Sequence, residues 1–254
     1  MTAGTQVRPA APAPESFRAT LQRLAGAQKG SAGAPAYSRF VNRRLGRGLA
    51  ALAFHAGLTP NAVTGISAVF TGTGIALLLL LPPSWATGLA VAGCLVAGYA
   101  FDAADGQLAR LRGGGSPAGE WLDHMVDAVK LLSLHLAVLV ALYRFEVVEI
   151  GPLLLIPIGY CIADGALFFA MMLNEALRAR HGAATRAQPS DQRAGLTRSL
   201  VSLPTDYGVL ALVFVLWGAP ALFLPAYAVL FGATAAHLAL GSRKWFREMG
   251  RLPR

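Results

Sequence analysis

Residues 102–127 read DAADGQLARLRGGGSPAGEWLDHMVD, and this stretch decides the fold. It carries four aspartates, Asp102, Asp105, Asp123 and Asp127. The glycine-rich turn at 113–117 separates them into two pairs, and apolar runs continue on both sides, so the pairs belong to two helices of one hairpin. A carboxylate at membrane depth costs at least about 2.5 kcal/mol on insertion scales. Some favourable interaction must therefore offset the cost of placing these aspartates there.

The composition indicates a polytopic membrane protein. Of the 254 residues, 55% are hydrophobic and only 14% are charged, with a mean hydropathy of +0.51. These values are too apolar for an ordinary soluble domain of this length. The net charge of +9 therefore indicates attraction to anionic lipid headgroups. Nucleic-acid binding is not expected, because no basic stripe is interleaved with aromatic residues.

The N-terminal region divides into two segments. Residues 1–35 are rich in Ala, Pro and Gly and lack an apolar run, so we expect a disordered tail, with a transit peptide as the alternative. Residues 36–59 mix Arg with Leu, Phe and Val. This pattern predicts a juxtamembrane amphipathic helix on the membrane surface, although a plain juxtamembrane tether fits it equally well.

Six apolar stretches then predict an all-α catalytic domain of six transmembrane helices at 60–242, followed by a basic cytoplasmic tail at 243–254. The fifth stretch is the shortest. The stretches lie near 61–81, 86–111, 117–143, 150–177, 205–218 and 220–241.

The basic residues predict the orientation. Eight Lys and Arg precede the first span, two lie between spans two and three, five lie at 178–198 and five follow residue 242. These segments fall on one side of a six-span protein and hold 20 of the 22 basic residues. The positive-inside rule places both termini and the 113–117 turn in the cytoplasm.

Helical periodicity groups the aspartates. At about 100° per residue, Asp102 and Asp105 lie about 60° apart on one helix, and Asp123 and Asp127 about 40° apart on the other. Counting outward from the turn places Asp105 level with Asp123, and Asp102 nearly level with Asp127. The four carboxylates can therefore converge near the cytoplasmic boundary of the membrane.

Clustered carboxylates repel one another unless protons or cations relieve the repulsion. Hard oxygen ligands suit Mg²⁺ or Mn²⁺, and four of them can hold two ions. Gly106 leaves room beside the ligands for a diphosphate, and Arg110, about one turn further on, can pair with a phosphate oxygen. The alternative is that Arg110 serves only the positive-inside pattern.

The residues DxxDGxxAR, eight further residues and GxxxDxxxD resemble the signature of the CDP-alcohol phosphotransferase (CDP-alcohol phosphatidyltransferase) family. The chain has all eight fixed positions, Asp102, Asp105, Gly106, Ala109, Arg110, Gly119, Asp123 and Asp127. Among class I members, it most resembles phosphatidylinositol phosphate synthases and phosphatidylglycerophosphate synthases. The resemblance also covers LTPNAVT at 58–64, although TPN is equally an ordinary helix cap.

The resemblance implies an enzyme of phospholipid biosynthesis that transfers a phosphatidyl group from a CDP-linked lipid, CDP-diacylglycerol first, to an alcohol and releases CMP. Asp102, Asp105 and Asp123 would be metal ligands, and Asp127 the base and a ligand of the second ion. The expected contacts to the CDP moiety are Asn61, Thr64, Gly106, Arg110 and Ser116. The resemblance also implies a homodimer in the cytoplasmic membrane of a bacterium, with the active site facing the cytoplasm.

Three basic residues suggest the acceptor. Lys130 follows Asp127 by almost one turn, and Arg193 and Arg198 precede the fifth span. Together they would favour a phosphorylated alcohol, such as inositol phosphate or glycerol 3-phosphate. Alternatively, the arginines serve topology or lipid headgroups, and Lys130 offsets the aspartate charge.

Two further polar residues, His124 and Asp164, lie in predicted spans but are not fixed positions of the motif. His124 points about 100° away from Asp123 on the helix, so we expect it to pack against another span, with contact to a ligand or substrate as the alternative. Asp164 repeats an Asp-Gly pair without the rest of the motif, and we interpret it as a polar contact within the bundle, with a functional role as the alternative.

Two other functions compete with the enzyme. An ion-coupled transporter would also use intramembrane carboxylates, but it predicts inverted repeats and interrupted helices, which the sequence lacks. A catalytically silent scaffold of the same family is disfavoured by the intact motif.

Overall fold

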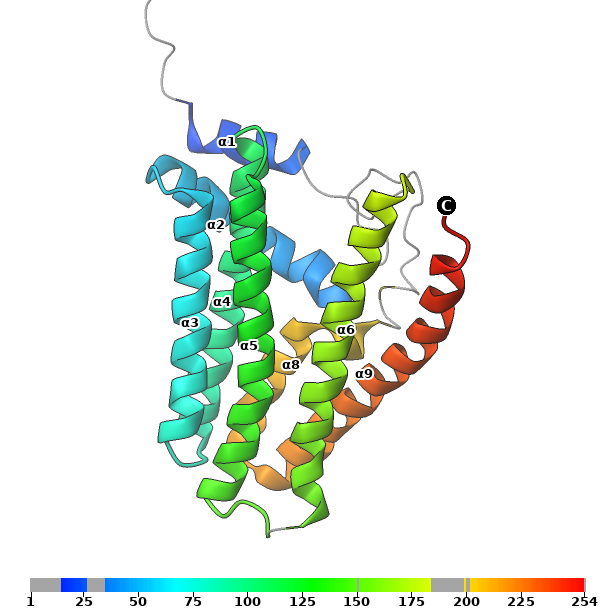
Figure 1. Ribbon diagram of the computed structural model, residues 1–254. Helices are drawn as coiled ribbons and strands as arrows, with labels where there is room; N and C mark the ends of the chain where they lie inside the picture. The colour runs from blue at the N-terminus through cyan, green and yellow to red at the C-terminus, as the bar shows by residue number, and fades with distance from the viewer. Residues whose placement is uncertain (1–14, 27–34, 150, 184–198, 200–201, 254) are drawn as a thin grey trace, which may run out of the picture.

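The computed structural model describes residues 15–26, 35–149, 151–183, 199 and 202–253, and every regular element in these ranges is helical (Figure 1). This confirms the all-α prediction. The elements are α1 (Phe17–Gly26), a π-helical segment (Ser38–Asn42), α2 (Arg43–His55), α3 (Pro60–Leu80), α4 (Trp85–Leu111), α5 (Pro117–Arg144), a 3₁₀ turn (Pro152–Leu154), α6 (Leu155–Arg180), a 3₁₀ turn (Leu203–Thr205), α8 (Tyr207–Val213), a 3₁₀ helix (Phe214–Gly218) and α9 (Pro220–Met249).

Five helices of the described chain are long and apolar enough to cross a bilayer: α3, α4, α5, α6 with its preceding turn, and α9. Their starts follow from capping chemistry. Thr59, Ser84 and Ser116 each accept a hydrogen bond from a backbone amide of the first turn of α3, α4 and α5, respectively. In α3 and α5 a proline follows at the first helical position, where its missing N–H costs nothing.

The predicted fifth span is not confirmed as a membrane crossing. It consists of α8 and the 3₁₀ helix after it, a shorter apolar segment over Tyr207–Gly218. Twelve residues at about 1.5 to 2.0 Å each reach about 18 to 24 Å, less than the hydrocarbon core of about 30 Å. The segment is nevertheless central, because Phe214 and Trp217 are fully buried.

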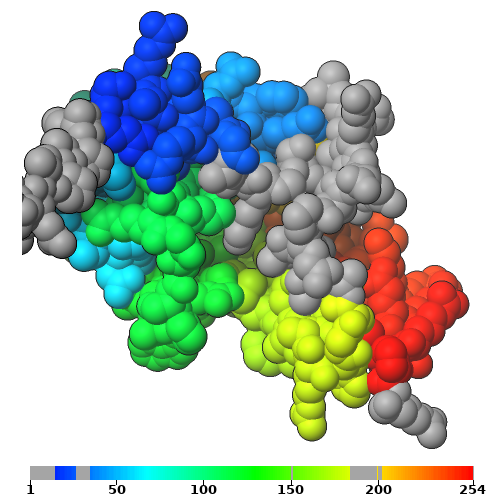
Figure 2. All heavy atoms as spheres, turned by 90° about the horizontal axis from the view of Figure 1, so that it is seen from above, coloured from blue at the N-terminus to red at the C-terminus, as the bar shows by residue number. Residues whose placement is uncertain are grey.

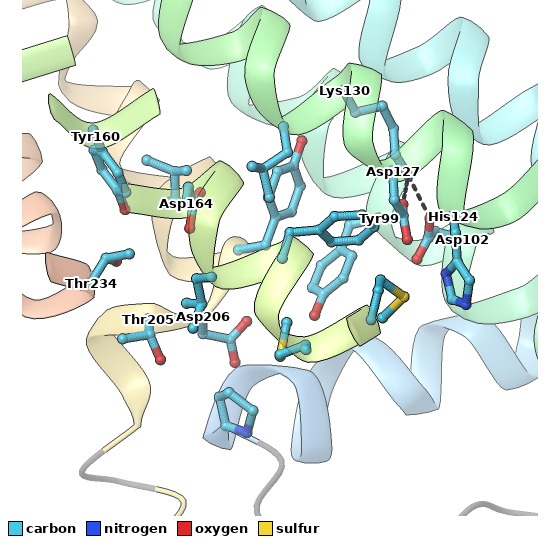
Figure 3. A pocket seen from close by; sticks show the side chains of 18 residues that line it. Tyr99, Asp102, His124, Asp127, Lys130, Tyr160, Asp164, Thr205, Asp206 and Thr234 are labelled. Atoms are coloured by element: carbon cyan, nitrogen blue, oxygen red, sulfur yellow. Dashed lines mark hydrogen bonds and ion pairs between the residues drawn. The ribbon is translucent and has the colours of Figure 1, made fainter. Parts of the chain in front are cut away.

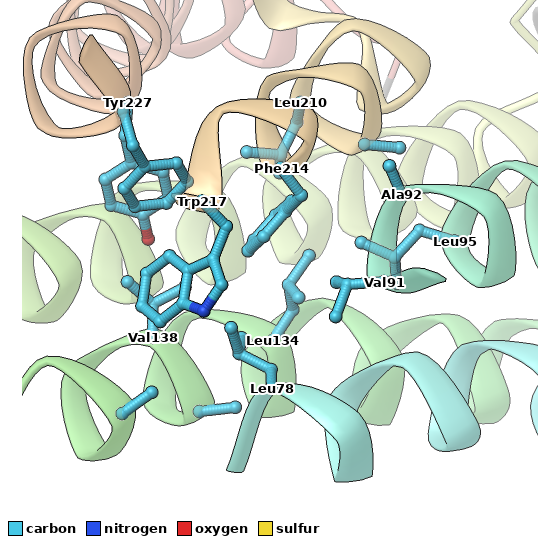
Figure 4. Packing of buried hydrophobic residues seen from close by; sticks show 14 of the residues in the cluster. Leu78, Val91, Ala92, Leu95, Leu134, Val138, Leu210, Phe214, Trp217 and Tyr227 are labelled. Atoms are coloured by element: carbon cyan, nitrogen blue, oxygen red, sulfur yellow. The ribbon is translucent and has the colours of Figure 1, made fainter. Parts of the chain in front are cut away.

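Those aromatic side chains sit at the centre of the main hydrophobic cluster (Figure 4). Phe214 and Trp217 pack with Tyr227 of α9 against side chains of α3, α4 and α5, including Leu78, Val91, Leu95, Leu134 and Val138. Gly88 permits the close approach of α4, since a Cβ there would lie 2.5 Å from the Phe214 carbonyl oxygen. The short segment of α8 and the 3₁₀ helix after it therefore packs against both α4 and α9.

The expected disorder of residues 1–35 is wrong for α1. Leu24 is buried in a second cluster with Ala50 of α2 and Leu108 of α4, and Arg23 donates to the Leu111 carbonyl oxygen. The Ala, Pro and Gly content of the whole segment concealed a ten-residue amphipathic helix. Residues 1–14 and 27–34 lie outside the described part of the chain.

The predicted 36–59 helix is present as the π-helical segment and α2. Its buried face, which includes Gly46, Ala50 and Ala53, lies against the bundle, and a Cβ on Gly46 would meet Ala103 at 2.8 Å. Leu45 and Leu52 are exposed. Its position on a membrane surface stays a prediction. At the other terminus, α9 continues to Met249, so part of the expected tail is helical.

One end of the bundle carries α1, α2, the turn between α4 and α5, and the carboxyl end of α9 (Figure 1). Seen onto this end, α1 and α2 lie on one side and the ends of α6 and α9 on another, with the start of α5 between them (Figure 2). The described parts of the segments assigned to one side from their basic residues therefore lie together.

Candidate active site

The hairpin of α4 and α5 places the aspartates as the sequence count predicts. Gly113 and Gly114 adopt φ angles of 96° and 125°, which few other residues tolerate, and so they reverse the chain between the two helices. Asp102 and Asp105 lie on α4, and Asp123 and Asp127 lie on α5. Asp102 and Asp127 form the first cross-helix pair, and Asp105 and Asp123 form the second.

Lys130 joins the first pair (Figure 3). Its Nζ donates to Asp102 Oδ1 at 2.5 Å and lies 2.7 Å from Asp127 Oδ1. The lysine side chain is only 12% exposed, so solvent screens these ion pairs weakly. The ammonium group therefore offsets part of the charge of two carboxylates that would otherwise repel each other.

Thr64 supports the second pair from α3. Its hydroxyl donates to Asp105 Oδ2 at 2.6 Å, and both side chains are buried. Asp105 and Asp123 line one cavity. A hydrogen bond to a carboxylate fixes its orientation and leaves its second oxygen for another partner.

The carboxylates fit a divalent cation. Ligand atoms of Asp123, His124 and Asp127 lie within 4.8 Å of one another, the one such cluster among the described residues. Carboxylate oxygens suit Mg²⁺ or Mn²⁺, and one imidazole does not exclude either ion. This cluster does not include Asp102 or Asp105 of α4. Asp102 lines one cavity with Asp127, and Asp105 lines another with Asp123.

The position of His124 differs in part from expectation. It does pack against α6, with its ring centroid 6.4 Å from that of Phe168. However, it also belongs to the cluster with Asp127, because residues three apart on a helix share a face. The angle between His124 and Asp123 alone does not reveal this neighbour, because Asp127 lies one turn further along the helix.

A cavity of about 510 Å³ opens beside Asp105 and Asp123. All five residues predicted to contact the CDP moiety line it, namely Asn61, Thr64, Gly106, Arg110 and Ser116. Two glycines of the motif shape its wall. A Cβ on Gly119 would lie 3.0 Å from Asn61 Oδ1, and one on Gly106 would lie 3.4 Å from an Arg110 guanidinium nitrogen. A side chain at Gly119 would therefore crowd the Asn61 amide, whereas one at Gly106 would come into contact with the end of the Arg110 side chain.

A second cavity of about 340 Å³ opens beside Asp102, Asp127 and Lys130 (Figure 3). It reaches α6 and α9, where Tyr160, Asp164 and Thr234 line it, and apolar walls come from side chains such as Leu131, Leu167, Phe168, Met171 and Leu210. His124 lines both cavities. The aspartate cluster therefore stands where two cavities meet.

The predicted acceptor residues have different outcomes. Lys130 lines the second cavity but is already paired with Asp102 and Asp127. Arg193 and Arg198 lie outside the described residues. The sequence interpretation did not include Tyr160 or Thr234, which carry no motif and reach the cavity only through the packing of α6 and α9.

A carboxylate cluster on a bundle of apolar helices, between a cavity lined by an arginine and a second, mixed cavity, is an arrangement that suits metal-assisted phosphoryl transfer. The sequence pattern of the CDP-alcohol phosphatidyltransferase family matches residues 57–241. The chain therefore belongs to the CDP-alcohol phosphatidyltransferase family, whose members are multi-pass membrane transferases of phospholipid biosynthesis.

Solved structures support the fold. The chain is similar to the Mycobacterium tuberculosis phosphatidylinositol phosphate synthase PgsA1 with CDP-DAG bound, at 22% identity and a TM-score of 0.52, over 81% of this chain and 94% of that one. A structure of the same synthase with manganese and citrate matches at 20% identity and a TM-score of 0.51, over 78% and 87% of the two chains. No curated protein sequence matches the chain.

Proposed function

We propose that the protein transfers the phosphatidyl group of CDP-diacylglycerol to the hydroxyl group of a small alcohol and releases CMP. The observation that carries this proposal is the meeting of two cavities at the four aspartates. A transferase needs separate sites for donor and acceptor that share one reacting centre. The similar synthase with CDP-DAG bound supports the choice of donor.

The donor would occupy the 510 Å³ cavity. Arg110 faces this cavity and offers a planar, permanently charged partner to the diphosphate. Asn61 and Ser116 would add polar contacts to the nucleotide side. Thr64 lines the same cavity, and because its hydroxyl donates to Asp105 it would also position that ligand.

Asp102, Asp105, Asp123 and Asp127 would hold Mg²⁺ or Mn²⁺, with one or two ions. A bound divalent cation would neutralise the diphosphate and stabilise the leaving phosphate. The similar synthase solved with manganese supports this choice of ion.

Asp127 would accept the proton of the attacking hydroxyl. The acceptor oxygen forms a bond to the phosphorus that carries the diacylglycerol, and the bond from that phosphorus to the bridging oxygen breaks. CMP leaves with the bond's electron pair. Asp127 suits the role of base because it lines the second cavity, on the side from which the acceptor would arrive.

A phosphorylated acceptor, inositol phosphate or glycerol 3-phosphate, remains the proposal from sequence. Its support now rests on Arg193 and Arg198, since Lys130 is paired with two aspartates. Active-site access from the cytoplasm, the bacterial cytoplasmic membrane and a homodimer are parts of the same proposal. A transporter is not favoured, because the carboxylates line cavities at one end of one hairpin and the chain belongs to an enzyme family.

The proposal is tested by supplying purified protein with CDP-diacylglycerol, Mn²⁺ and single acceptors, and identifying the lipid product by mass spectrometry. We expect one acceptor to give a new phospholipid and CMP in equal amounts. Transport of a cation across proteoliposomes without any CMP would instead support the alternative.

A further inference from the structure

A buried polar network lies at the far end of the 340 Å³ cavity, away from the aspartate cluster (Figure 3). His135 of α5 is fully buried, with Nδ1 2.6 Å from the Tyr227 hydroxyl and Nε2 3.0 Å from Asp164 Oδ2. Tyr160 stacks on its imidazole with a centroid separation of 4.0 Å. The proposed chemistry uses none of these groups.

Ionisable side chains inside a membrane bundle are costly, and they usually mark a pathway or a binding site. A network that only joined α5, α6 and α9 could be replaced by apolar packing at little cost. Asp164 differs from a purely structural group because part of its side chain faces the cavity. His135 is enclosed, whereas Asp164 is 16% exposed and lines the cavity beside Tyr160 and Thr234.

The chemistry of this end of the cavity favours a hydrogen-bond donor. An ionised carboxylate only accepts hydrogen bonds, and its two oxygens can accept about four in all. His135 uses one of these positions. Tyr160 and Thr234 line the same end and share a hydrogen bond between their hydroxyl groups, whose remaining lone pairs can accept from a ligand. A phosphate would be repelled by Asp164, whereas hydroxyl groups of a ligand would be bound.

We propose that Asp164, oriented by His135, binds hydroxyl groups of a polyol acceptor while another hydroxyl of the same molecule reacts beside Asp127. This inference rests on the proposed function, because it assigns the remote end of the acceptor cavity. Both carboxylates line that cavity, so a molecule with several hydroxyls can satisfy both. A simple alcohol would leave Asp164 without a ligand partner.

The cavity volume agrees with a headgroup-sized acceptor. At about 340 Å³ it lies near the lower end of the usual range for small-molecule sites, which is about 300 to 1,000 Å³. A phosphate on the acceptor would lie away from Asp164, because like charges repel. The proposal therefore concerns the hydroxyl-bearing part of the acceptor and applies to polyols with or without a phosphate.

The test compares acceptor kinetics in three variants of the full chain in lipid nanodiscs with Mn²⁺ and CDP-diacylglycerol. The variants are Asp164→Asn, Thr234→Val and, as the matched control, Glu175→Gln, an acid-to-amide change elsewhere on α6. The acceptors are myo-inositol, myo-inositol 1-phosphate, glycerol 3-phosphate and propane-1,3-diol. Loss of one charge-assisted hydrogen bond should raise the KM of the active polyol about tenfold or more in Asp164→Asn.

The expected pattern is specific to acceptor binding. The KM of CDP-diacylglycerol should stay close to that of the parent protein, Thr234→Val should show a smaller rise in acceptor KM, and Glu175→Gln should show none. The preference for the polyol over propane-1,3-diol should shrink in Asp164→Asn. A variant that melts at a lower temperature but keeps its acceptor KM would show a purely structural network and overturn the proposal.

A binding measurement separates this inference from the proposed function. Tritiated myo-inositol and tritiated glycerol 3-phosphate are titrated onto the same proteins without donor. If no acceptor releases CMP, the proposed function fails, but saturable binding that Asp164→Asn weakens would still support the polyol subsite. Absence of saturable binding to the parent protein, or equal binding to Asp164→Asn, would overturn it.

Discussion

Lys130 Nζ lies 2.7 Å from Asp127 Oδ1, so the proposed base has an internal cation as its partner. The two residues are three apart on α5, and the same ammonium reaches across to Asp102 of α4. If these aspartates hold a divalent metal as proposed, Lys130 and the metal would share carboxylates, and the charge of Lys130 would oppose the binding of a cation at this side of the cluster.

Replacing Lys130 should strengthen metal binding. In Lys130→Met, Asp102 and Asp127 lose the positive charge with which they pair, so we expect the dissociation constant for Mn²⁺ to fall several-fold, measured by calorimetry without donor. Lys130→Arg, which keeps the charge, serves as the control and should stay near the parent value. Weaker Mn²⁺ binding in Lys130→Met would show that Lys130 supports the ion, contrary to this account.

Thr64→Val should weaken metal binding at the Asp105 end of the aspartate cluster. It removes the hydroxyl that orients Asp105 and keeps the shape of the side chain. A hydrogen bond to a charged group contributes about 1.5 to 3 kcal/mol, so the Mn²⁺ concentration for half-maximal CMP release should rise about 10- to 100-fold. Thr73→Val is the control, because Thr73 is exposed on the same helix and its hydroxyl donates only to the Val69 carbonyl. An equal response of both variants would remove Thr64 from the positioning role.

Asp127→Asn should separate binding from turnover. The amide cannot accept the acceptor's proton, and general-base assistance contributes about 10²- to 10⁴-fold in rate, so CMP release should fall within that range. Binding of radiolabelled CDP-diacylglycerol should persist, because Asp127 lines the other cavity. The control is Glu146→Gln in the loop after α5. Near-normal turnover in Asp127→Asn would exclude it as the base.

Leu24→Ala should release α1 from the bundle. Leu24 is 1% exposed, and loss of a buried leucine side chain costs about 2 to 5 kcal/mol. We expect faster hydrogen exchange of the amides in Phe17–Gly26, whereas Arg18→Ala, at an exposed position of the same helix, should leave the exchange rate unchanged. Protection retained in Leu24→Ala would mean that Arg23 and Thr20 hold the helix without it.

The sequence predicts the hairpin well because its signals are local. Aspartate spacing at 100° per residue and a glycine turn suffice to pair Asp102 with Asp127 and Asp105 with Asp123. Capping by Thr59 is likewise readable from adjacent residues, and the cap is present.

The remaining features depend on packing between distant segments. Nothing near Asp164 in the sequence indicates that His135 and Tyr227 converge on it from two other helices. The apolar run at 205–218 does not reveal that a 3₁₀ helix shortens it. The partner of Lys130 was also ambiguous, because its spacing from Asp127 allows contact with either the acceptor or the aspartates.

The most direct test of the central claim is CMP release from CDP-diacylglycerol as a function of Mn²⁺ concentration. We measure it for the parent chain and for the paired variant Asp105→Asn/Asp123→Asn. The account predicts no release with a chelator, saturable recovery as Mn²⁺ is restored, and no recovery in the paired variant. Release that persists without divalent metal, or that recovers normally in the paired variant, would contradict the claim that the aspartates hold the catalytic metal.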